Sequence, residues 1–457
     1  MLFFKVKVRR IKFWWNLSVA YVSKYKLLLL SVLLVFFSLI FAFYKILPII
    51  LRTNIVTLGY VGVYSVDSIP TEVLKLATQS LISQGADGKP LPSLASNWQV
   101  SEDGKTYVVF LKDNLVWHDN SPVLAKDISV AISNVQIHAL NNKAIEFKLP
   151  NPIASFPQAL NKPVFKAKSF YGTGKFRIVD INQVEGVVKK ISLVSKDKTL
   201  PRVDIKFFQT EQQALNALKI GEIKSLTVSN AKILEKWPNL EVEKITDTNT
   251  VVAFFFNNQD PLLSSKDLRQ ALSYAIQKSE FDGINAFSPI SLTNWAYNNN
   301  VKRYEYNTSR AKELLSKSEI KSPKITLTST PGLEDLAEKI KKDWQEIGIE
   351  VSVDRSKTVP DNFQTLLVYE QLLPDPDQYS LWHSTQNDTN ITGYKNVKVD
   401  KLLEDARNTS DETRRKELYF DFQKFLVEDA PAVFLYYPYK YQITYKNVMP
   451  LLSKLPK

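Results

Sequence analysis

The sequence contains no cysteine among its 457 residues and has only three histidines, His118, His138 and His383. The absence of cysteine excludes disulfide bonds, thiolate metal sites, a cysteine nucleophile and the lipid-modified cysteine of a bacterial lipoprotein. None of the histidines belongs to an HExxH motif or to another closely spaced ligand pair, so we predict no zinc or non-haem iron centre. We expect neither a metal nor any other cofactor.

The motifs of the common enzyme classes are also missing. The chain has no GxSxG elbow, no GxxxxGK[ST] loop and no GxGxxG fingerprint. Ser318 to Lys321 (SEIK) fits SxxK, but the partner motifs of that chemistry are absent. Asp375 and Asp377 are a possible acid–base pair, although a proline-containing turn at a surface or cleft edge explains them better. The sequence therefore predicts no catalytic residue and no enzyme.

Positive charge is concentrated at the amino terminus. The first 26 residues contain seven Lys and Arg and no acid, so they account for +7 of the net charge of +12. The rest of the chain is mildly basic and has no run such as KKRKR. Nucleic-acid binding needs a concentrated stripe of positive charge, so we predict no nucleic-acid partner.

A long apolar segment follows this basic leader. An unbroken apolar run of 18 residues begins at Leu27, and after one lysine it continues to Leu51. About 20 residues of helix cross the hydrocarbon core of a bilayer. A cleaved signal peptide is the alternative, but it needs a shorter run and a small-residue cleavage site. We expect a basic cytoplasmic leader over 1–26, an uncleaved transmembrane anchor over 27–51, and a single-pass protein of the cell membrane with an extracytoplasmic carboxy-terminal domain.

Strand and helix patterns alternate through residues 54–457. The sequence from Trp98 to Leu111 (WQVSEDGKTYVVFL) predicts a hairpin, with Asp103-Gly104 in its tight turn. From Lys324 to Asp354, two strand patterns flank a helix with one apolar face, which ends at Gly348. A helix between two parallel strands is typical of a sheet covered by helices, so we predict an α/β fold.

Two further helices have clear apolar faces, which we expect to pack in a core rather than to bind ligand. One covers Asp267 to Glu280, where Ser264 with Asp267 is compatible with a capping box. The other covers Asp411 to Glu428, ends at Ala430-Pro431, and is followed by a predicted strand from Val433 to Tyr437.

Several segments together resemble one protein family. The sequence from Leu91 to Asp127 (LPSLASNWQVSEDGKTYVVFLKDNLVWHDNSPVLAKD) resembles the signature stretch of the family 5 extracellular solute-binding proteins, the peptide- and nickel-binding group. Asn120 replaces the glycine usual in that stretch, and asparagine also tolerates a left-handed backbone. Further matches follow in the family's order and span nearly all of residues 55–445: Gly172 to Gly174, Leu268 to Ile276, Tyr306 to Leu315, Asp375 to Ser384, Gly393-Tyr394, Val399 to Leu403, and Arg415 to Leu435.

The resemblance implies a two-lobe fold of the type II periplasmic-binding-protein kind, with a hinge and an interlobe ligand cleft. Residues 54–250 would form the first lobe, with a small flanking subdomain at about 80–170. Residues 251–435 would form the second lobe, and 436–457 would return to the first. The interval between Asp127 and Gly172 is short for the family, which would trim the small subdomain.

The implied function is that of the substrate-binding component of an ABC importer, which captures an oligopeptide or a similar small solute and delivers it to permease subunits. The alternative is a membrane-tethered ligand sensor or interaction protein that kept the fold and lost transport. Genes for two permeases and two ATPases beside this one would distinguish the two functions.

The resemblance also implies candidate ligand-binding residues: Tyr64, Glu370, Gln371, Leu372, Asp375, Tyr379 and Trp382. Peptide-binding members carry an acid three residues before the acid of an acid-Pro pair, where it meets the α-ammonium group of the peptide. Aligned on Asp375-Pro376, that position is Leu372, so we expect a cleft without the usual amine anchor. Two alternatives stay open: Glu370, on the same strand face, replaces the acid, or Leu372 simply packs in the core.

Overall fold

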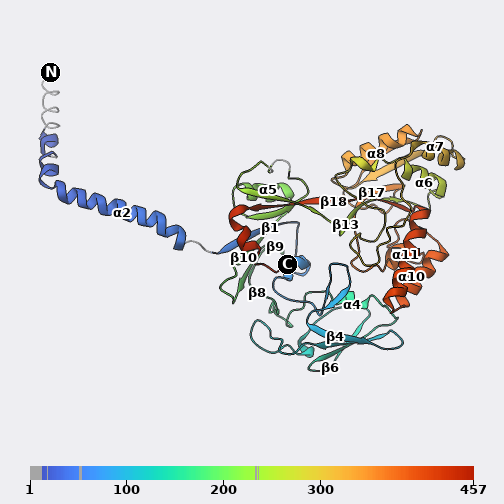
Figure 1. Ribbon diagram of the computed structural model, residues 1–457, viewed down its shortest axis with the longest axis horizontal. Coiled ribbons are helices and arrows are strands. Elements are labelled where there is room, and N and C mark those ends of the chain that lie inside the picture. Colours follow the sequence, from blue (N-terminus) through green and yellow to red (C-terminus); the bar gives the residue numbers. More distant parts are fainter. Residues whose placement is uncertain (1–12, 18, 51–53, 232–233, 235, 457) are drawn as a thin grey trace, which may run out of the picture. The chain divides into compact units, whose positions relative to one another are not determined.

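The computed structural model describes residues 13–456 except 18, 51–53, 232–233 and 235 (Figure 1). The chain divides into two compact units, Met1–Ile55 and Val56–Lys457. Residues 1–12 of the expected leader, and the end of the expected anchor at Leu51, lie outside the described residues.

Two helices lie in the described part of the first unit. Helix α2 (Lys26–Ile50) contains the apolar run, and a shorter helix, Phe13–Lys24, precedes it. Within the described part of this unit, no single helix meets the length and apolarity of a membrane span, whereas Phe13–Lys24 and Lys26–Phe41 meet them together, as a pair bent by 73°.

The second unit is built on a twelve-stranded sheet. Ten of the described strands follow the order β16-β15-β17-β13-β18-β11-β1-β10-β9-β8, and β12 and β14 pair with β18. The strands are β1 (Ile55–Val61), β8 (Phe176–Val184), β9 (Val187–Ser195), β10 (Arg202–Phe208), β11 (Ser225–Val228), β12 (Leu240–Thr246), β13 (Thr250–Phe256), β14 (Gly283–Asn285), β15 (Lys324–Ser329), β16 (Glu350–Arg355), β17 (Thr365–Gln371) and β18 (Ala432–Tyr445).

The long strand β18 joins two lobes. Its first half pairs with β13 and β14, and its second half pairs with β11 and β12. We call the part with β1, β8–β12 and the end of β18 the first lobe, and the part with β13–β17 and the start of β18 the second lobe. The chain crosses between them in the turn from β12 to β13 and in the middle of β18. Asp247 holds the two crossings together, since its N–H donates to the Pro438 carbonyl (2.9 Å) and its carboxylate pairs with Lys440 (2.5 Å).

Helices cover both faces of the sheet in the second lobe. Alternate side chains of β13 point to opposite faces. Val252, Phe254 and Phe256 pack with helices α6 (Lys266–Tyr274), α7 (Thr308–Lys317) and α8 (Glu334–Glu346). The side chains on the other face of β13, those of Val251, Ala253 and Phe255, pack with α10 (Val397–Asn408) and α11 (Glu412–Asp429), which lie together in Figure 1. The predicted strand–helix–strand unit is confirmed as β15, α8 and β16, with β15 and β16 parallel.

The first lobe carries helix α5 (Glu211–Lys219) and the short helices α3 (Thr71–Leu74) and α12 (Met449–Leu452). A small subdomain is built on a separate four-stranded sheet of β4 (Ala95–Val100), β5 (Thr106–Leu111), β7 (Ala144–Lys148) and β6 (Gln136–Asn141), with β2 (Ile82–Gln84), β3 (Pro90–Pro92) and α4 (Phe156–Ala159) beside it. The predicted hairpin is confirmed as β4 and β5, and Gly104 has a left-handed φ of 68°. Asn120, in place of the usual glycine, keeps its turn with a φ of 67°.

The predicted capping box of α6 is wrong by one residue. Ser265 is the N-cap and accepts a hydrogen bond from the Leu268 N–H, whereas the Ser264 hydroxyl donates to the Pro261 carbonyl. Helix α6 also ends at Tyr274, earlier than predicted, and a 3-10 turn covers Lys278–Glu280. Helix α11 begins at Glu412, one residue later than predicted, with Asp411 as its N-cap, and Ala430 ends it with a left-handed backbone.

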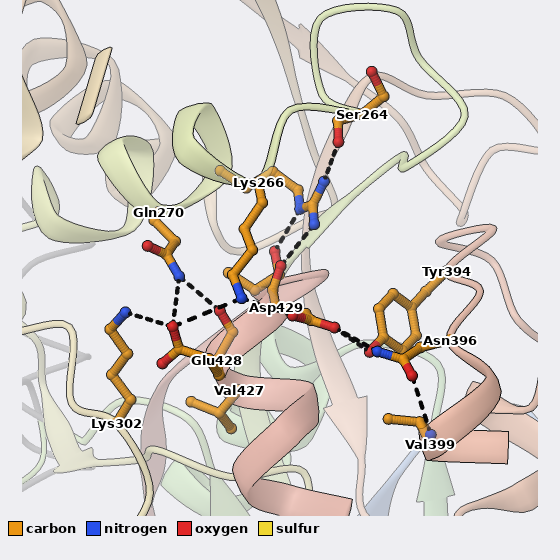
Figure 2. A network of polar contacts seen from close by, with 12 residues as sticks. Ser264, Lys266, Gln270, Lys302, Tyr394, Asn396, Val399, Val427, Glu428 and Asp429 are labelled. Atoms are coloured by element: carbon orange, nitrogen blue, oxygen red, sulfur yellow. Dashed lines mark hydrogen bonds and ion pairs between the residues drawn. The ribbon is translucent and has the colours of Figure 1, made fainter. Parts of the chain in front are cut away.

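The carboxyl end of α11 is fixed by a polar network (Figure 2). Asp429 accepts hydrogen bonds from Lys266 Nζ (2.8 Å), the Tyr394 hydroxyl (2.7 Å) and Asn396 Nδ2 (2.8 Å), while Gln270 and Lys302 bind Glu428. Burial alone would raise the pKa of Asp429, but these donors lower it overall. The network therefore joins α6, α11 and the loop before α10 into one body.

Candidate ligand-binding site

An apolar pocket of about 210 Å³ lies at the end of β17 in the second lobe. Its apolar lining comes from several separate segments of the second lobe and includes Phe255, Leu372, Leu373, Leu381, Trp382 and Ile391. The pocket brings together four of the candidate residues that the sequence suggested: Glu370, Gln371, Leu372 and Trp382. All of its lining belongs to the second lobe.

Glu370 is the one ionisable side chain among the described residues that line this pocket. It is partly buried, and no described residue gives its carboxyl group a hydrogen bond or an ion pair. Loss of hydration raises the pKa of Glu370 to about 7. Burial is the one cause of this rise, and no other charge contributes to it.

Leu372 and Gln371 form the wall next to Glu370. Leu372 is 7% exposed and packs in the second-lobe core with Trp382. It lies two residues from Glu370, on the same strand face, and lines the same pocket. Gln371 is turned toward the crossing between the lobes, where its Nε2 donates to the Asn249 carbonyl (2.8 Å).

Asp375 lies outside this pocket, in a buried polar network. Arg415 Nη2 lies 3.2 Å from its carboxylate, and the Asp377 N–H donates to the same oxygen. Burial raises the pKa of Asp375, and the positive charge of Arg415 opposes that rise. Asp377 pairs with Arg407 (2.9 Å) and accepts a hydrogen bond from Ser155 of the small subdomain (3.0 Å). The two acids are buried, so they do not lie at the surface, which was one of the two positions expected for their turn.

Two other candidate residues also lie outside the pocket. Tyr379, in the short helix α9 (Tyr379–Trp382), stacks on His383 with ring centroids 4.1 Å apart, and the Arg407 guanidinium lies 4.1 Å from its ring. Tyr64 belongs to the first lobe, where its ring packs against Phe207 and its hydroxyl donates to the Val61 carbonyl (2.9 Å).

A second pocket, of about 370 Å³, lies in the first lobe at the ends of β1 and β11. These two strands are parallel, and ligands of α/β proteins often bind at the carboxyl ends of parallel strands. Its lining includes Gly59, Tyr60, Thr227 and Ser229, together with Lys440 and Gln442 of β18. The sequence motifs did not predict this pocket, although the strand pattern before Gly59 was a usable signal.

The motifs also did not predict that Phe255, Leu381 and Ile391 line the second-lobe pocket. Phe255 and Leu381 look like ordinary core residues, and Ile391 lies in a polar loop without a motif. No pattern in the sequence shows that they meet at the end of β17. Among the described residues, no group of three or more His, Cys, Asp or Glu side chains is arranged to hold a metal ion.

Two lobes joined by two crossings, with an open pocket in each lobe, define a solute-binding architecture. The family described as "Bacterial extracellular solute-binding proteins, family 5 Middle" matches residues 89–135 and 129–390. The chain belongs to this family. It is a solute-binding protein and not an enzyme.

Known relatives cover most of the chain. The oligopeptide-binding protein AppA of Bacillus subtilis is 26% identical over 85% of this chain and 85% of its own length. A dipeptide-binding protein of Escherichia coli is 23% identical over 76% of this chain and 80% of its own length.

Solved structures share the two-lobe fold. The ABC transporter substrate-binding protein CtaP of Listeria monocytogenes superposes with a TM-score of 0.74 at 22% identity, covering 86% of this chain and 94% of that one. NikZ of Campylobacter jejuni in complex with Ni(L-His) gives a TM-score of 0.70 at 23% identity, covering 87% and 95%.

Proposed function

We propose that this chain is the extracytoplasmic substrate-binding component of an ABC importer, and that it captures a peptide or a similar small solute between its lobes. The observation that carries the proposal is the apolar pocket beside a crossing between the lobes, with the unpartnered Glu370 in its lining. The names of the relatives support a peptide-like solute, since they include oligopeptide- and dipeptide-binding proteins.

The two crossings serve as the hinge. The first lies between Thr246 and Thr250 and the second near Pro438, so residues 54–250 and 436–457 would move as one lobe and 251–435 as the other. Of the candidate residues, Glu370, Gln371, Leu372 and Trp382 line the second-lobe pocket and would contact the ligand there.

The apolar segment of α2 anchors the protein in the cell membrane, with the amino terminus in the cytoplasm. Leu27, Phe36 and Phe41 are each more than half exposed, and such a surface is stable in lipid but not in water. Mass spectrometry of the mature protein and protease accessibility in spheroplasts test this. A mature amino terminus near Arg52 would contradict an uncleaved anchor.

A binding screen tests the proposed function. The full chain, purified in mild detergent, is screened by thermal shift against peptides, nickel–histidine complexes and sugars, and we expect a peptide or related solute to raise the Tm. Small-angle scattering should then show a smaller radius of gyration with that solute. An unchanged profile at saturation would indicate a rigid interaction module instead.

A further inference from the structure

We infer that one end of the first lobe lies on the membrane surface and binds the headgroups of anionic phospholipids. The inference rests on the proposed function, because it takes the apolar run of α2 to be a membrane anchor. It goes beyond that function, because it assigns the lipid to a surface of the folded second unit.

The described strands of the first lobe each bring one end to the same place, next to Thr57 at the start of β1. β1 and β11 are parallel, and the Lys224 N–H, just before β11, donates to the Thr57 carbonyl (2.7 Å). β18 is antiparallel to β11 and β12, so its end at Tyr445 lies beside the start of β12. The Gly62 N–H, just after β1, donates to the Phe208 carbonyl at the end of β10 (2.7 Å), so β10 starts where β1 starts. The end of β9 and the start of β8 therefore lie there too.

Lysines gather around these strand ends, which we call the lysine-rich end. They are Lys175, Lys196, Lys198, Lys219, Lys224, Lys236, Lys446 and Lys454. The described acids there are Asp197, Glu222 and Glu241, and Glu222 already pairs with Lys206 (3.0 Å). Lys175, Lys198 and Lys236 are exposed and have no hydrogen bond or ion pair with another described residue. Such an excess of positive charge attracts anionic headgroups, and each lysine near the surface adds to the attraction.

Apolar side chains are exposed among these lysines. Ile220, in the turn between α5 and β11, is 79% exposed, and Trp237 and Met449 are exposed as well. Lys446 ties the segment of Trp237 to the end of β18, since its Nζ donates to the Pro238 carbonyl (3.0 Å). Tryptophan is enriched where lipid meets water. Lysines that meet headgroups, together with apolar side chains that enter the headgroup layer, fit a bilayer surface better than an acidic protein.

The solute pockets lie away from this end. The first-lobe pocket is at the carboxyl ends of β1 and β11, next to Val61 and Ser229, whereas the lysine-rich end is at their amino ends. The other pocket belongs to the second lobe. Binding to lipid would therefore leave both pockets open, and closure would move the second lobe against a first lobe held at the membrane.

The length of the chain supports the membrane as the partner. In the sequence, Thr57 lies six residues after Leu51, the last residue of the apolar run. Six extended residues span at most about 20 Å. A membrane that holds the apolar run therefore lies within that reach of the start of β1, where the lysine-rich end is.

Fluorescence quenching on the full chain in lipid nanodiscs tests the inference. Because the sequence has no cysteine, Ile220→Cys carries a single dye. The discs contain phosphatidylcholine alone or with phosphatidylglycerol, and both kinds contain a lipid with a quencher on its headgroup. We expect strong quenching in the anionic discs, weaker quenching in the neutral discs, and a loss of quenching at high salt. Val397→Cys labels an exposed residue of the second lobe and is the control, which should stay unquenched in both discs.

Charge variants of the dye-labelled chain test the role of the lysines. The ratio of quenched to unquenched dye lifetimes gives the equilibrium for surface contact. Replacing Lys175, Lys198 and Lys236 together by glutamine should lower this ratio in anionic discs at least about tenfold. The matched control replaces three exposed lysines of the second lobe by glutamine, Lys321, Lys342 and Lys357, and should leave the ratio unchanged. Thermal unfolding establishes that both triple variants are folded.

The outcomes separate the inference from the proposed function. A dye at residue 220 that stays unquenched in anionic discs would overturn the inference, leave an acidic protein as the partner of the lysines, and leave anchor and solute capture standing. Equal quenching in neutral and anionic discs, or an unchanged ratio in the first triple variant, would also overturn it. A chain that does not stay with the discs contradicts the anchor and the inference together, while the solute screen still decides solute capture.

Discussion

Glu370 and Asp375 are acids in the same segment, and burial raises the pKa of both, yet their surroundings differ. Asp375 has Arg415 beside it and receives a backbone hydrogen bond. Glu370 lines an open pocket, and its carboxyl group has no hydrogen-bond or ion-pair partner among the described residues. Burial alone therefore does not identify a binding residue. The absence of an internal partner, within the described residues, is what makes Glu370 available to a ligand.

Removing the arginine that pairs with Asp375 should cause the greatest loss of stability. Arg415→Met leaves Asp375 buried beside an apolar side chain, and removing one partner of a buried ion pair costs about 3–5 kcal/mol. The two side chains are 10% and 11% exposed, so water screens them little. Chemical denaturation of the full chain in detergent should show the corresponding loss in the free energy of unfolding.

A double variant sharpens this test. Asp375→Leu together with Arg415→Met removes both charges, and the pair should recover most of the stability that the single variant loses. If Arg415→Met is as stable as the native chain, Asp375 is already neutral in the folded protein and Arg415 does not stabilise its charge.

Removing the charge of Glu370, which has no partner among the described residues, should raise the free energy of unfolding instead of lowering it. The pKa of Glu370 in the folded protein, about 7, lies above its ordinary value, so the folded state holds the proton more tightly than the unfolded state. The free energy of unfolding should therefore fall as the pH rises from about 4.5 to 7, and stay low above 7. Glu370→Gln without ligand removes this loss and should stabilise the protein by about 2–3 kcal/mol at pH 8 and very little at pH 4.

Denaturation of the native chain and of Glu370→Gln at several pH values provides the measurement. Glu305→Gln is the control, because Glu305 is an exposed acid that does not line the pocket. A Glu370→Gln variant that is destabilised at pH 8 would show that the carboxylate has a stabilising partner after all.

The sequence predicted the parts of this comparison that depend on local patterns. Alternation placed Glu370 and Leu372 on one strand face, and turn residues located the hairpin at Gly104. Helical spacing with a terminal glycine was enough to predict α8 between two parallel strands. These features are set by neighbours within a few residues along the chain.

The sequence did not predict which acid is paired. Arg415 lies on α11, 40 residues from Asp375, and nothing in either segment indicates that they meet. The sequence also did not predict which residues line the pocket. The reason is the same, since Phe255 comes from β13 and Ile391 from a distant loop. Long-range packing decides such contacts. Local patterns can also mislead: Ser264 and Ser265 are adjacent and both can cap a helix, and the predicted N-cap of α6 was wrong by one residue.

The smallest expected effect concerns Asp377, whose partner is less buried. Arg407 is 28% exposed, against 9% for Asp377, so water can partly replace it when it is removed. Arg407→Gln should lower the free energy of unfolding by about 1–2 kcal/mol, between the values typical of exposed and of buried pairs. The glutamine can still approach Tyr379, whose ring the guanidinium contacts, so the change isolates the charge better than alanine does.

Denaturation at low and at high salt measures the effect, and it should shrink only slightly with salt because Asp377 is buried. Ser155→Ala, which removes the hydrogen bond of 3.0 Å from the small subdomain, is the neutral control and should be independent of salt. If Arg407→Gln destabilises the protein as much as Arg415→Met does, the exposure of the arginine does not determine how much each ion pair contributes to stability. The burial of the acid alone would then determine it.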